Sequence, residues 1–139
     1  MSSEMILDGA VVPARFDLSP EAEQALPLAQ WLESGPPEGV GVILEGADSI
    51  DALQAALDEL PFVALHLPRY TDGRIYSHAR RLRELWGYQG VILVFGDVLR
   101  DQLFYMHRCG INAFYMREDQ DLHASLAAFS LYSENYQYN

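Results

Sequence analysis

The chain has 139 residues, of which 50% are hydrophobic and 12% aromatic, and its formal net charge is −11. This length and composition suit one folded globular domain and exclude wholesale disorder. The acidic balance argues against nonspecific binding to nucleic acid or to anionic membranes, and no apolar run approaches the ~20 residues of a membrane-spanning helix.

The first 38 residues predict a small extension that precedes the main domain. Residues 5–12 predict a β-hairpin whose turn is Asp8-Gly9, a strong hairpin signal. Residues 19–21, Ser-Pro-Glu, have the cap, proline and acid typical of a helix start, and residues 28–32 predict another helical turn. Residues 35–39, Gly-Pro-Pro-Glu-Gly, predict a linker. We therefore expect a hairpin-and-linker extension at 1–38 and an α/β domain at 39–139.

From residue 40 onward, short apolar runs alternate with segments of helical spacing. The runs predict strands at 40–44, 62–67, 91–95 and 111–116, and the spacing predicts helices at 49–60, 73–86, 97–109 and 121–132. Strands that are apolar throughout and separated by helices predict a parallel sheet covered on both faces, with right-handed crossovers. The tail, residues 131–139, is rich in tyrosine and predicts either packing on the domain or a contact segment for a partner.

The expected fold class is therefore α/β, with a small four-stranded parallel sheet flanked by helices and an N-terminal β-hairpin extension. A half (β/α) barrel is the alternative, because its repeating units have the same sequence pattern.

Basic residues are concentrated in one part of the chain. All nine cations are arginines, and eight of them lie in residues 69–117. Four acidic residues share that segment, which gives it a charge of +4, whereas the rest of the chain carries −15. A basic segment on an acidic molecule predicts an anionic ligand or an acidic partner surface. The alternative is that these arginines form structural ion pairs with the acidic remainder.

Two polar loops follow the second and third predicted strands of the main domain. In open parallel sheets, ligands bind outside the carboxyl ends of the strands, where free N–H groups at helix starts favour anions. If these strands are neighbours, arginines from both loops lie along one edge of the sheet. We therefore predict a ligand-binding or partner-binding site formed by Arg69, Thr71, Asp72, Gly73, Arg74, Tyr76, Ser77, Asp97, Arg100, Asp101 and Gln102.

Simpler structural roles compete for several of these residues. Residues 71–73 are typical of a capped turn that starts a helix, and Asp97 is expected to be the N-cap of the helix after it. Arg74 lies in the first turn of a predicted helix, where a cation opposes the helix dipole. We therefore expect a negative group beside Arg74, either Asp72, Asp97 or a bound anion.

Signals of catalysis or of a bound cofactor are weak. The four histidines lack the spacing of a zinc motif, and one cysteine cannot form a CxxC pair, so we predict no metal site. No glycine-rich motif for a dinucleotide or a nucleoside triphosphate occurs, so we predict no cofactor. Cys109 lies late in a predicted helix, whose C-terminal dipole does not activate a thiol, and it is expected to be a small core residue.

The same features predict a location. A lone cysteine cannot form an internal disulfide, which suits a reducing cytoplasm. The N-terminus has no basic region followed by an apolar stretch, so we expect no signal peptide. The expected protein is cytoplasmic, with neither a nucleic acid nor a membrane as partner.

At the two polar loops the sequence resembles a known family. Residues 67–90 (LPRYTDGRIYSHARRLRELWGYQG) and 96–114 (GDVLRDQLFYMHRCGINAF) are similar to the hallmark segments of a bacterial family labelled domain of unknown function 934. The resemblance is strong over residues 61–137, and residues 6–9 resemble the hairpin with which members commonly begin, whereas residues 17–38 depart most from the family. The matching positions are Thr71, Asp72, Gly73, Arg74, Tyr76, Ser77, Arg80, Gly96, Asp97, Arg100, Asp101, Gln102, Tyr105, Arg108, Cys109 and Gly110.

The resemblance implies an oxidoreductase-like accessory of sulfite reduction, because genes of this family tend to neighbour those for sulfite reductase and sulfate assimilation. It assigns no catalytic residues. We therefore expect an accessory protein of assimilatory sulfite reduction that docks on sulfite reductase or its electron donor.

Two alternatives stay open. One is a small enzyme or sensor that binds an oxyanion such as sulfite or sulfate, or a phosphorylated metabolite, at the two loops. The other is a structural, oligomer-forming domain without a ligand. Enzymatic activity is left open, and the missing cofactor motif favours a non-catalytic role.

Overall fold

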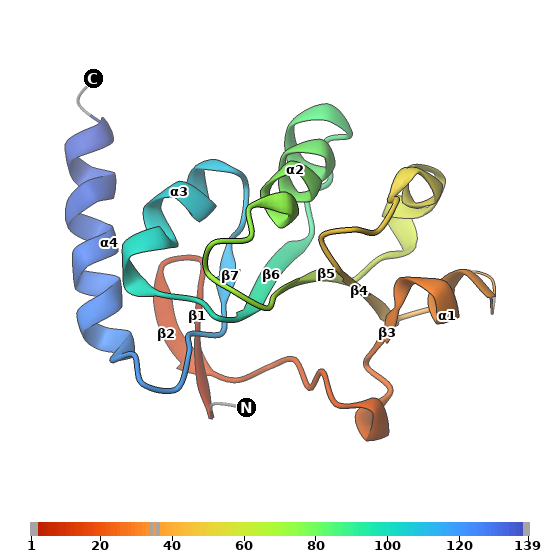
Figure 1. Ribbon diagram of the computed structural model, residues 1–139, viewed down its shortest axis with the longest axis horizontal. Coiled ribbons are helices and arrows are strands. Elements are labelled where there is room, and N and C mark those ends of the chain that lie inside the picture. The colour runs from red at the N-terminus through yellow and green to blue at the C-terminus, as the bar shows by residue number, and fades with distance from the viewer. Residues whose placement is uncertain (1–2, 34, 36, 138–139) are drawn as a thin grey trace.

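The computed structural model describes residues 3–33, 35 and 37–137, with side chains through residue 129. Within this part of the chain, the strands form one seven-stranded mixed sheet in the order β2-β1-β7-β6-β5-β4-β3 (Figure 1). The α/β class predicted from the sequence is confirmed, whereas the four-stranded sheet is wrong in detail.

Five neighbouring strands of the sheet are parallel. They are β3 (Ala25–Pro27), β4 (Gly41–Leu44), β5 (Phe62–Leu67), β6 (Val91–Gly96) and β7 (Ala113–Phe114). β3 is the strand that the sequence analysis missed. Its three residues carry no periodicity of their own, and they are extended because they pair with β4. Pro27 is tolerated because β3 is an edge strand.

The predicted N-terminal hairpin is confirmed, and it belongs to the same sheet. β1 (Glu4–Leu7) and β2 (Ala10–Pro13) are antiparallel, and the turn between them has positive φ at both Asp8 and Gly9, as a tight hairpin requires. β1 also pairs antiparallel with β7, through Ile6 and Leu7. Three strands of the common sheet thus lie within residues 1–38.

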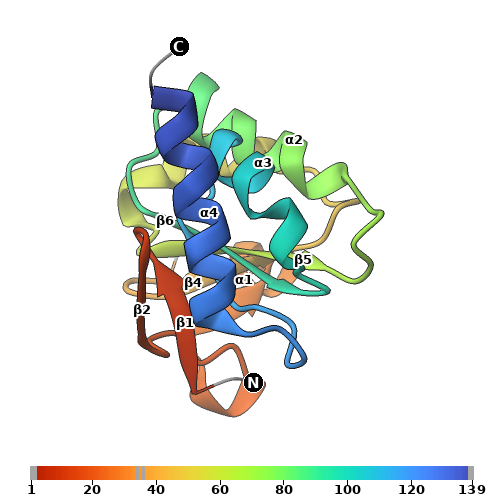
Figure 2. The ribbon, with the colours of Figure 1, turned by 90° about the vertical axis from the view of Figure 1, so that its left-hand side faces the viewer.

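Most helices begin and end close to the predicted positions, but several differ in type, and the helix expected at 121–132 continues to residue 137. The segment expected as a helix at 49–60 is a 3-10 helix, η2 (Asp51–Glu59), and the helix expected at 97–109 starts only at residue 100. The others are η1 (Pro20–Ala22), α1 (Leu28–Glu33), α2 (Arg74–Arg80), the π-helical turn η3 (Arg81–Leu85), η4 (Arg100–Gln102), α3 (Leu103–Arg108) and α4 (Leu122–Gln137). α4 runs beside β1, β2 and α3 (Figure 2). The side chains of the tyrosine-rich tail lie outside the described residues.

All of the large helices pack on one face of the sheet, which corrects the prediction of helices on both faces. In β5, Val63, Leu65 and Leu67 face the helices. The residues between and before them, Phe62 and Ala64, face the opposite side of the sheet. The parallel strands follow one another in chain order, so right-handed crossovers place the helices that connect them on the same side (Figure 1). The half (β/α) barrel, the alternative prediction, would also have its parallel strands paired in chain order.

Among the described residues, the segment that crosses the other face of the sheet is 14–24, which we call the strap. Tyr115 of this face donates a hydrogen bond from its hydroxyl to the Phe16 carbonyl at 2.6 Å and accepts one from the Phe16 N–H at 3.1 Å. The Phe16 ring packs on Phe62 with centroids 4.6 Å apart, and Leu18 is buried. The strap therefore covers part of this face and leaves Phe95 and His66 only half-buried.

Candidate functional site

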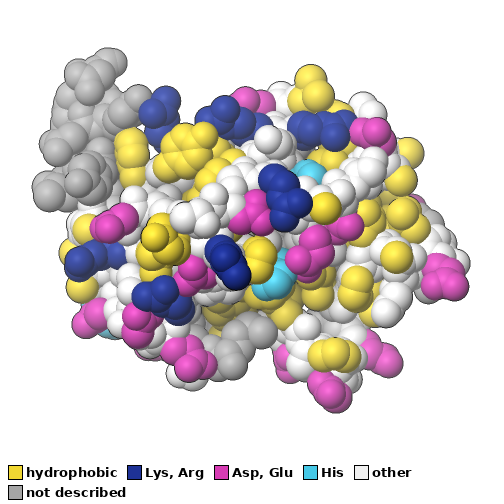
Figure 3. Space-filling view, in the orientation of Figure 1, with side chains coloured by type: hydrophobic (Ala, Val, Ile, Leu, Met, Phe, Trp, Pro, Cys, Tyr) yellow, Lys and Arg dark blue, Asp and Glu magenta, His cyan; other side chains and the backbone are white. Residues whose placement is uncertain are grey.

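The carboxyl ends of the parallel strands meet at one edge of the sheet, and the polar loops after β5, β6 and β7 lie there. Arginine and acidic side chains are interspersed over this part of the surface (Figure 3). The predicted site residues come from the first two of these loops and from the helices that follow them, α2 and η4, so their contacts decide whether the two loops act together.

Tyr70 joins the two predicted loops. Its backbone N–H donates to Oδ2 of Asp97 at 2.7 Å, and its carbonyl accepts a hydrogen bond from Nε2 of Gln102 at 2.6 Å. Both backbone polar groups of this residue are therefore held by side chains of the neighbouring loop. The Tyr70 side chain is not enclosed by these contacts, since the residue is 52% exposed.

Asp97 is not the N-cap that the sequence analysis expected. The helix after it begins at Arg100 without a side-chain cap, and the Asp97 carboxylate instead bonds the Tyr70 N–H and Nη1 of Arg117, the latter at 2.8 Å. These bonds, that from Tyr70 first, hold the pKa of Asp97 below its usual value. Asp97 therefore joins the loops after β5, β6 and β7.

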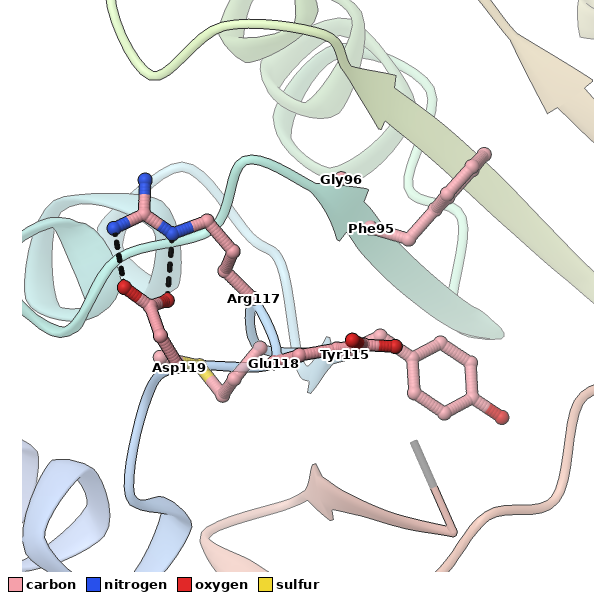
Figure 4. Close-up of a pocket in the computed structure, with 7 residues that line it drawn as sticks. Phe95, Gly96, Tyr115, Arg117, Glu118 and Asp119 are labelled. Carbon is pink, nitrogen blue, oxygen red and sulfur yellow. Dashed lines mark hydrogen bonds and ion pairs between the residues drawn. The ribbon is translucent and has the colours of Figure 1, made fainter. Parts of the chain in front are cut away.

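Arg117 is saturated by two carboxylates. Besides Asp97, its guanidinium forms a bidentate pair with Asp119, with Nε at 2.6 Å and Nη2 at 2.7 Å from the two carboxylate oxygens (Figure 4). The hydrogen bonds from Arg117 lower the pKa of Asp119 to about 2. Arg117 thus acts as a clamp between loops, and its charge is already neutralised.

Arg74 has the negative partner that its place at a helix start requires. Nε and Nη2 of Arg74 donate to the Asp72 carboxylate at 3.0 and 2.8 Å, and the Arg74 N–H donates to the same group. The side-chain hydrogen bond lowers the pKa of Asp72 to about 2. Of the partners considered from the sequence, Asp72 is the one that the structure places beside Arg74.

Gln102 and Tyr76 are half-buried beside the loop that carries Tyr70. Nε2 of Gln102 is 3.4 Å from the Tyr76 hydroxyl, and among the described residues its Oε1 is buried without a hydrogen-bond partner. Burial raises the pKa of Tyr76 to about 12. The Tyr76 ring meets Tyr105 edge-on, with centroids 5.1 Å apart, so this part of the site is packed rather than hollow.

The other predicted residues lie at the surface. Arg69, Thr71, Gly73, Ser77, Arg100 and Asp101 are exposed. Within the described part of the chain, the guanidinium groups of Arg69 and Arg100 have no hydrogen bond or ion pair, although the Arg100 N–H donates to Gln120. These two arginines are therefore the cations of the predicted site whose charge is not used inside the fold.

Three further arginines of the basic segment make internal contacts. Arg83 donates to the carbonyls of Tyr88, Gly90 and Gly110 and to the side chain of Asn112. Arg81 pairs with Asp51, and Arg80 donates to the Tyr105 hydroxyl at 3.0 Å. The structural interpretation of the basic segment thus holds for part of it.

Tyr70 and Arg117, which belong to this edge, were not among the residues predicted from the sequence. Tyr70 stands inside the first loop and was passed over because its role depends on backbone bonds to residues 27 and 32 positions away. Arg117 follows β7, and applying the strand-end rule to a third loop would have found it. No group of three or more metal-binding side chains occurs among the residues that the structure describes.

No helix in the described part of the chain is both long and apolar enough to cross a membrane.

Comparisons with known proteins agree with the resemblance seen in the sequence. A search of curated proteins found no match. A family model described as "Bacterial protein of unknown function (DUF934)" matches residues 41–139, well over half of the chain. The chain therefore belongs to the DUF934 family of bacterial proteins.

Proposed function

We propose that this protein is a non-catalytic accessory of assimilatory sulfite reduction, which docks on sulfite reductase or its electron donor. The docking surface is formed by Arg69, Tyr70 and Arg100, which we call the Tyr70 surface. The observation that carries the proposal is the conformation of Tyr70. Its backbone N–H and carbonyl are hydrogen-bonded by Asp97 and Gln102, while its side chain is exposed to solvent.

This arrangement suits protein recognition better than catalysis. Tyrosine and arginine are enriched among the residues that dominate binding energy at protein interfaces. A loop fixed before binding loses less conformational entropy when a partner docks. Arg69 and Arg100 add positive charge that no described residue neutralises, so the partner surface is expected to be acidic.

The identity of the partner rests on the family resemblance. Genes of this family tend to neighbour those for sulfite reductase, and an accessory without a cofactor motif is expected to act on a redox enzyme rather than replace it. Sulfite reductase and its electron donor are therefore the partners to test first.

The free charge of Arg69 and Arg100 also supports the alternative, a site for a small oxyanion or a phosphorylated metabolite. Such a site would belong to an enzyme or a sensor. Arg74 and Arg117 contribute less to it, because Asp72, Asp97 and Asp119 already occupy their guanidinium groups.

A capture experiment from sulfate-limited cells separates the two possibilities. The wild-type bait is expected to retain sulfite reductase or its electron donor, and Arg69→Ala and Arg100→Ala baits are expected to lose it. Arg15→Ala is the matched control, because it removes one exposed arginine outside the basic segment.

A melting-temperature series with sulfite and sulfate tests the alternative. Under the docking proposal, millimolar anion leaves the melting temperature where chloride at equal ionic strength leaves it. A rise that is specific to sulfite or sulfate and is lost in Arg69→Ala and Arg100→Ala would instead establish the oxyanion site.

A further inference from the structure

A cavity of about 490 Å³ opens on the sheet face that carries no helices, at the carboxyl ends of β6 and β7. Its walls include Phe95 and Tyr115, and its rim includes Arg117, Glu118 and Asp119 (Figure 4). It is open to solvent along much of its surface, and its strand-end position is where parallel sheets bind ligands. The Tyr70 surface does not line this cavity.

The aromatic walls are fixed and lie side by side. Val94 pairs with Phe114 across the two strands, so Phe95 and Tyr115 occupy the next register positions on the same face. The His66 ring stacks on Phe95, with centroids 5.0 Å apart and planes at 20°. His66 lies on β5 and Tyr115 on β7, the two strands that flank β6. His66 therefore covers one face of the Phe95 ring, and the other face is open to the cavity. A flat ring entering there would continue the stack.

The charges around the cavity are mainly negative. Asp97 and Asp119 share the single guanidinium of Arg117, which leaves that group of three with one net negative charge. Glu118 is exposed and has no hydrogen bond or ion pair within the described residues. Glu45, which bonds Nδ1 of His66 at 2.7 Å, is not part of the lining. An anion would be repelled from this cavity, whereas a cation would be attracted.

We propose that the cavity is a binding site for a small planar cation, a positively charged heteroaromatic ring that stacks on Phe95 beside Tyr115. The aromatic faces attract a flat cation through stacking and through the quadrupole of each ring. Glu118 supplies the carboxylate that the positive charge approaches. This site is separate from the Tyr70 surface and does not depend on the proposed docking.

Three probes with one ring skeleton and different charges test the site. They are 1-methylnicotinamide, a cation, nicotinamide, which is neutral, and nicotinate, an anion, and their binding to the full chain is followed by ligand-observed NMR titration. The cation is expected to bind most tightly, nicotinamide more weakly and nicotinate not at all. Equal binding of the three probes, or no binding of the cation at millimolar concentration, would overturn the proposal.

Variants distinguish the contribution of charge from that of stacking. Glu118→Gln is expected to weaken binding of the cation at least threefold and to leave nicotinamide unchanged. Phe95→Leu is expected to weaken both, because it keeps apolar volume but removes the flat ring. Tyr70→Ala should change neither, which separates this site from the docking surface. If Glu118→Gln, an exposed change that the fold tolerates, binds the cation as the wild type does, the proposed site is wrong.

Discussion

The arginines of residues 69–117 differ in what surrounds them, and their substitution should separate them into two groups. Arg83 is half-buried and donates to three backbone carbonyls and one amide oxygen. Arg69 is exposed and, within the described residues, its guanidinium has no hydrogen bond or ion pair. The same residue type therefore stabilises the fold at one position and is free for a partner at the other.

Replacing Arg83 with alanine should destabilise the protein by about 2–4 kcal/mol, because it leaves several half-buried carbonyls without donors. Arg69→Ala, the matched control, should change the free energy of unfolding by less than about 0.5 kcal/mol. Urea unfolding of both variants measures the difference. Equal stability of the two variants would mean that Arg83 is not a structural clamp.

Acid should weaken the ion pairs of these loops. The pKa values of Asp72 and Asp119 are lowered to about 2, and that of Asp97 is lowered as well. A carboxyl whose pKa is lower in the folded than in the unfolded state stabilises the fold above its unfolded value of 3.8, and this contribution is lost as pH falls through the folded value. Stability should therefore decline between about pH 4 and pH 2, and Asp97→Asn should flatten part of that decline.

The control for this pH dependence is Asp101→Asn, since Asp101 is exposed and its side chain has no hydrogen bond or ion pair within the described residues. Urea midpoints measured from pH 2 to pH 7 give the comparison. A pH dependence of Asp97→Asn identical to that of the wild type would contradict the role assigned to this carboxylate.

At the scale of elements, the strands predicted at 40–44, 62–67 and 91–95 are confirmed, whereas the strand expected at 111–116 is only the two residues of β7, Ala113–Phe114. β4, β5 and β6 agree with the predicted ranges to within one residue. β3 has three residues, and only its pairing with β4 makes it a strand. The Asp72–Arg74 pair is local and was among the expected partners, whereas the bonds of Asp97 join residues 20 and 27 positions away. No local sequence pattern indicates such long-range contacts.

The Tyr115 hydroxyl makes two hydrogen bonds to the strap. Tyr115→Phe removes both hydrogen bonds to Phe16 and keeps the ring, so it should destabilise the protein by about 1–2 kcal/mol. Amide exchange should rise in residues 14–24 and stay unchanged in β5 and β6. Tyr70→Phe, which alters an exposed ring, is the control and should show neither effect. Unchanged exchange in the strap would mean that Tyr115 does not hold it.

The end of β6 requires glycine for two reasons. Gly96 has φ of +110°, and a Cβ there would overlap the carbonyl of Leu67. Gly87 also has positive φ, +68°, but a Cβ there would meet nothing within 4 Å. Gly87→Ala should therefore cost about 1 kcal/mol, and Gly96→Ala should cost at least about 2 kcal/mol more. Thermal unfolding of both variants tests this, and equal costs would show that the close approach is not limiting.

At the scale of the whole molecule, the order of the strands determines where function can lie. Chain-order pairing puts all large helices on one face, leaves the other to the strap, and gathers three polar loops at one edge (Figure 1). The sequence predicted that edge correctly as the place where polar loops follow parallel strands. It did not predict which arginines are neutralised, because that depends on which loops are neighbours and how their side chains meet.

The two proposed surfaces have opposite electrostatic character, although both lie near this edge. The Tyr70 surface carries the unneutralised Arg69 and Arg100, while the cavity beside Phe95 is surrounded by an excess of carboxylates. A single chain can therefore offer one site to an acidic partner and a separate site to a cationic ligand.

Titration of purified sulfite reductase and of its electron donor with this protein, by calorimetry, is the decisive measurement for the docking proposal. The wild type should bind one of them, and Tyr70→Ala should weaken that binding at least about tenfold, as truncation of an interface hot spot does. Tyr70→Phe and Arg15→Ala should bind within about twofold of the wild type, since one keeps the ring and the other lies outside the surface. Failure of the wild type to bind either protein, or equal affinity of Tyr70→Ala and the wild type, would contradict the proposal.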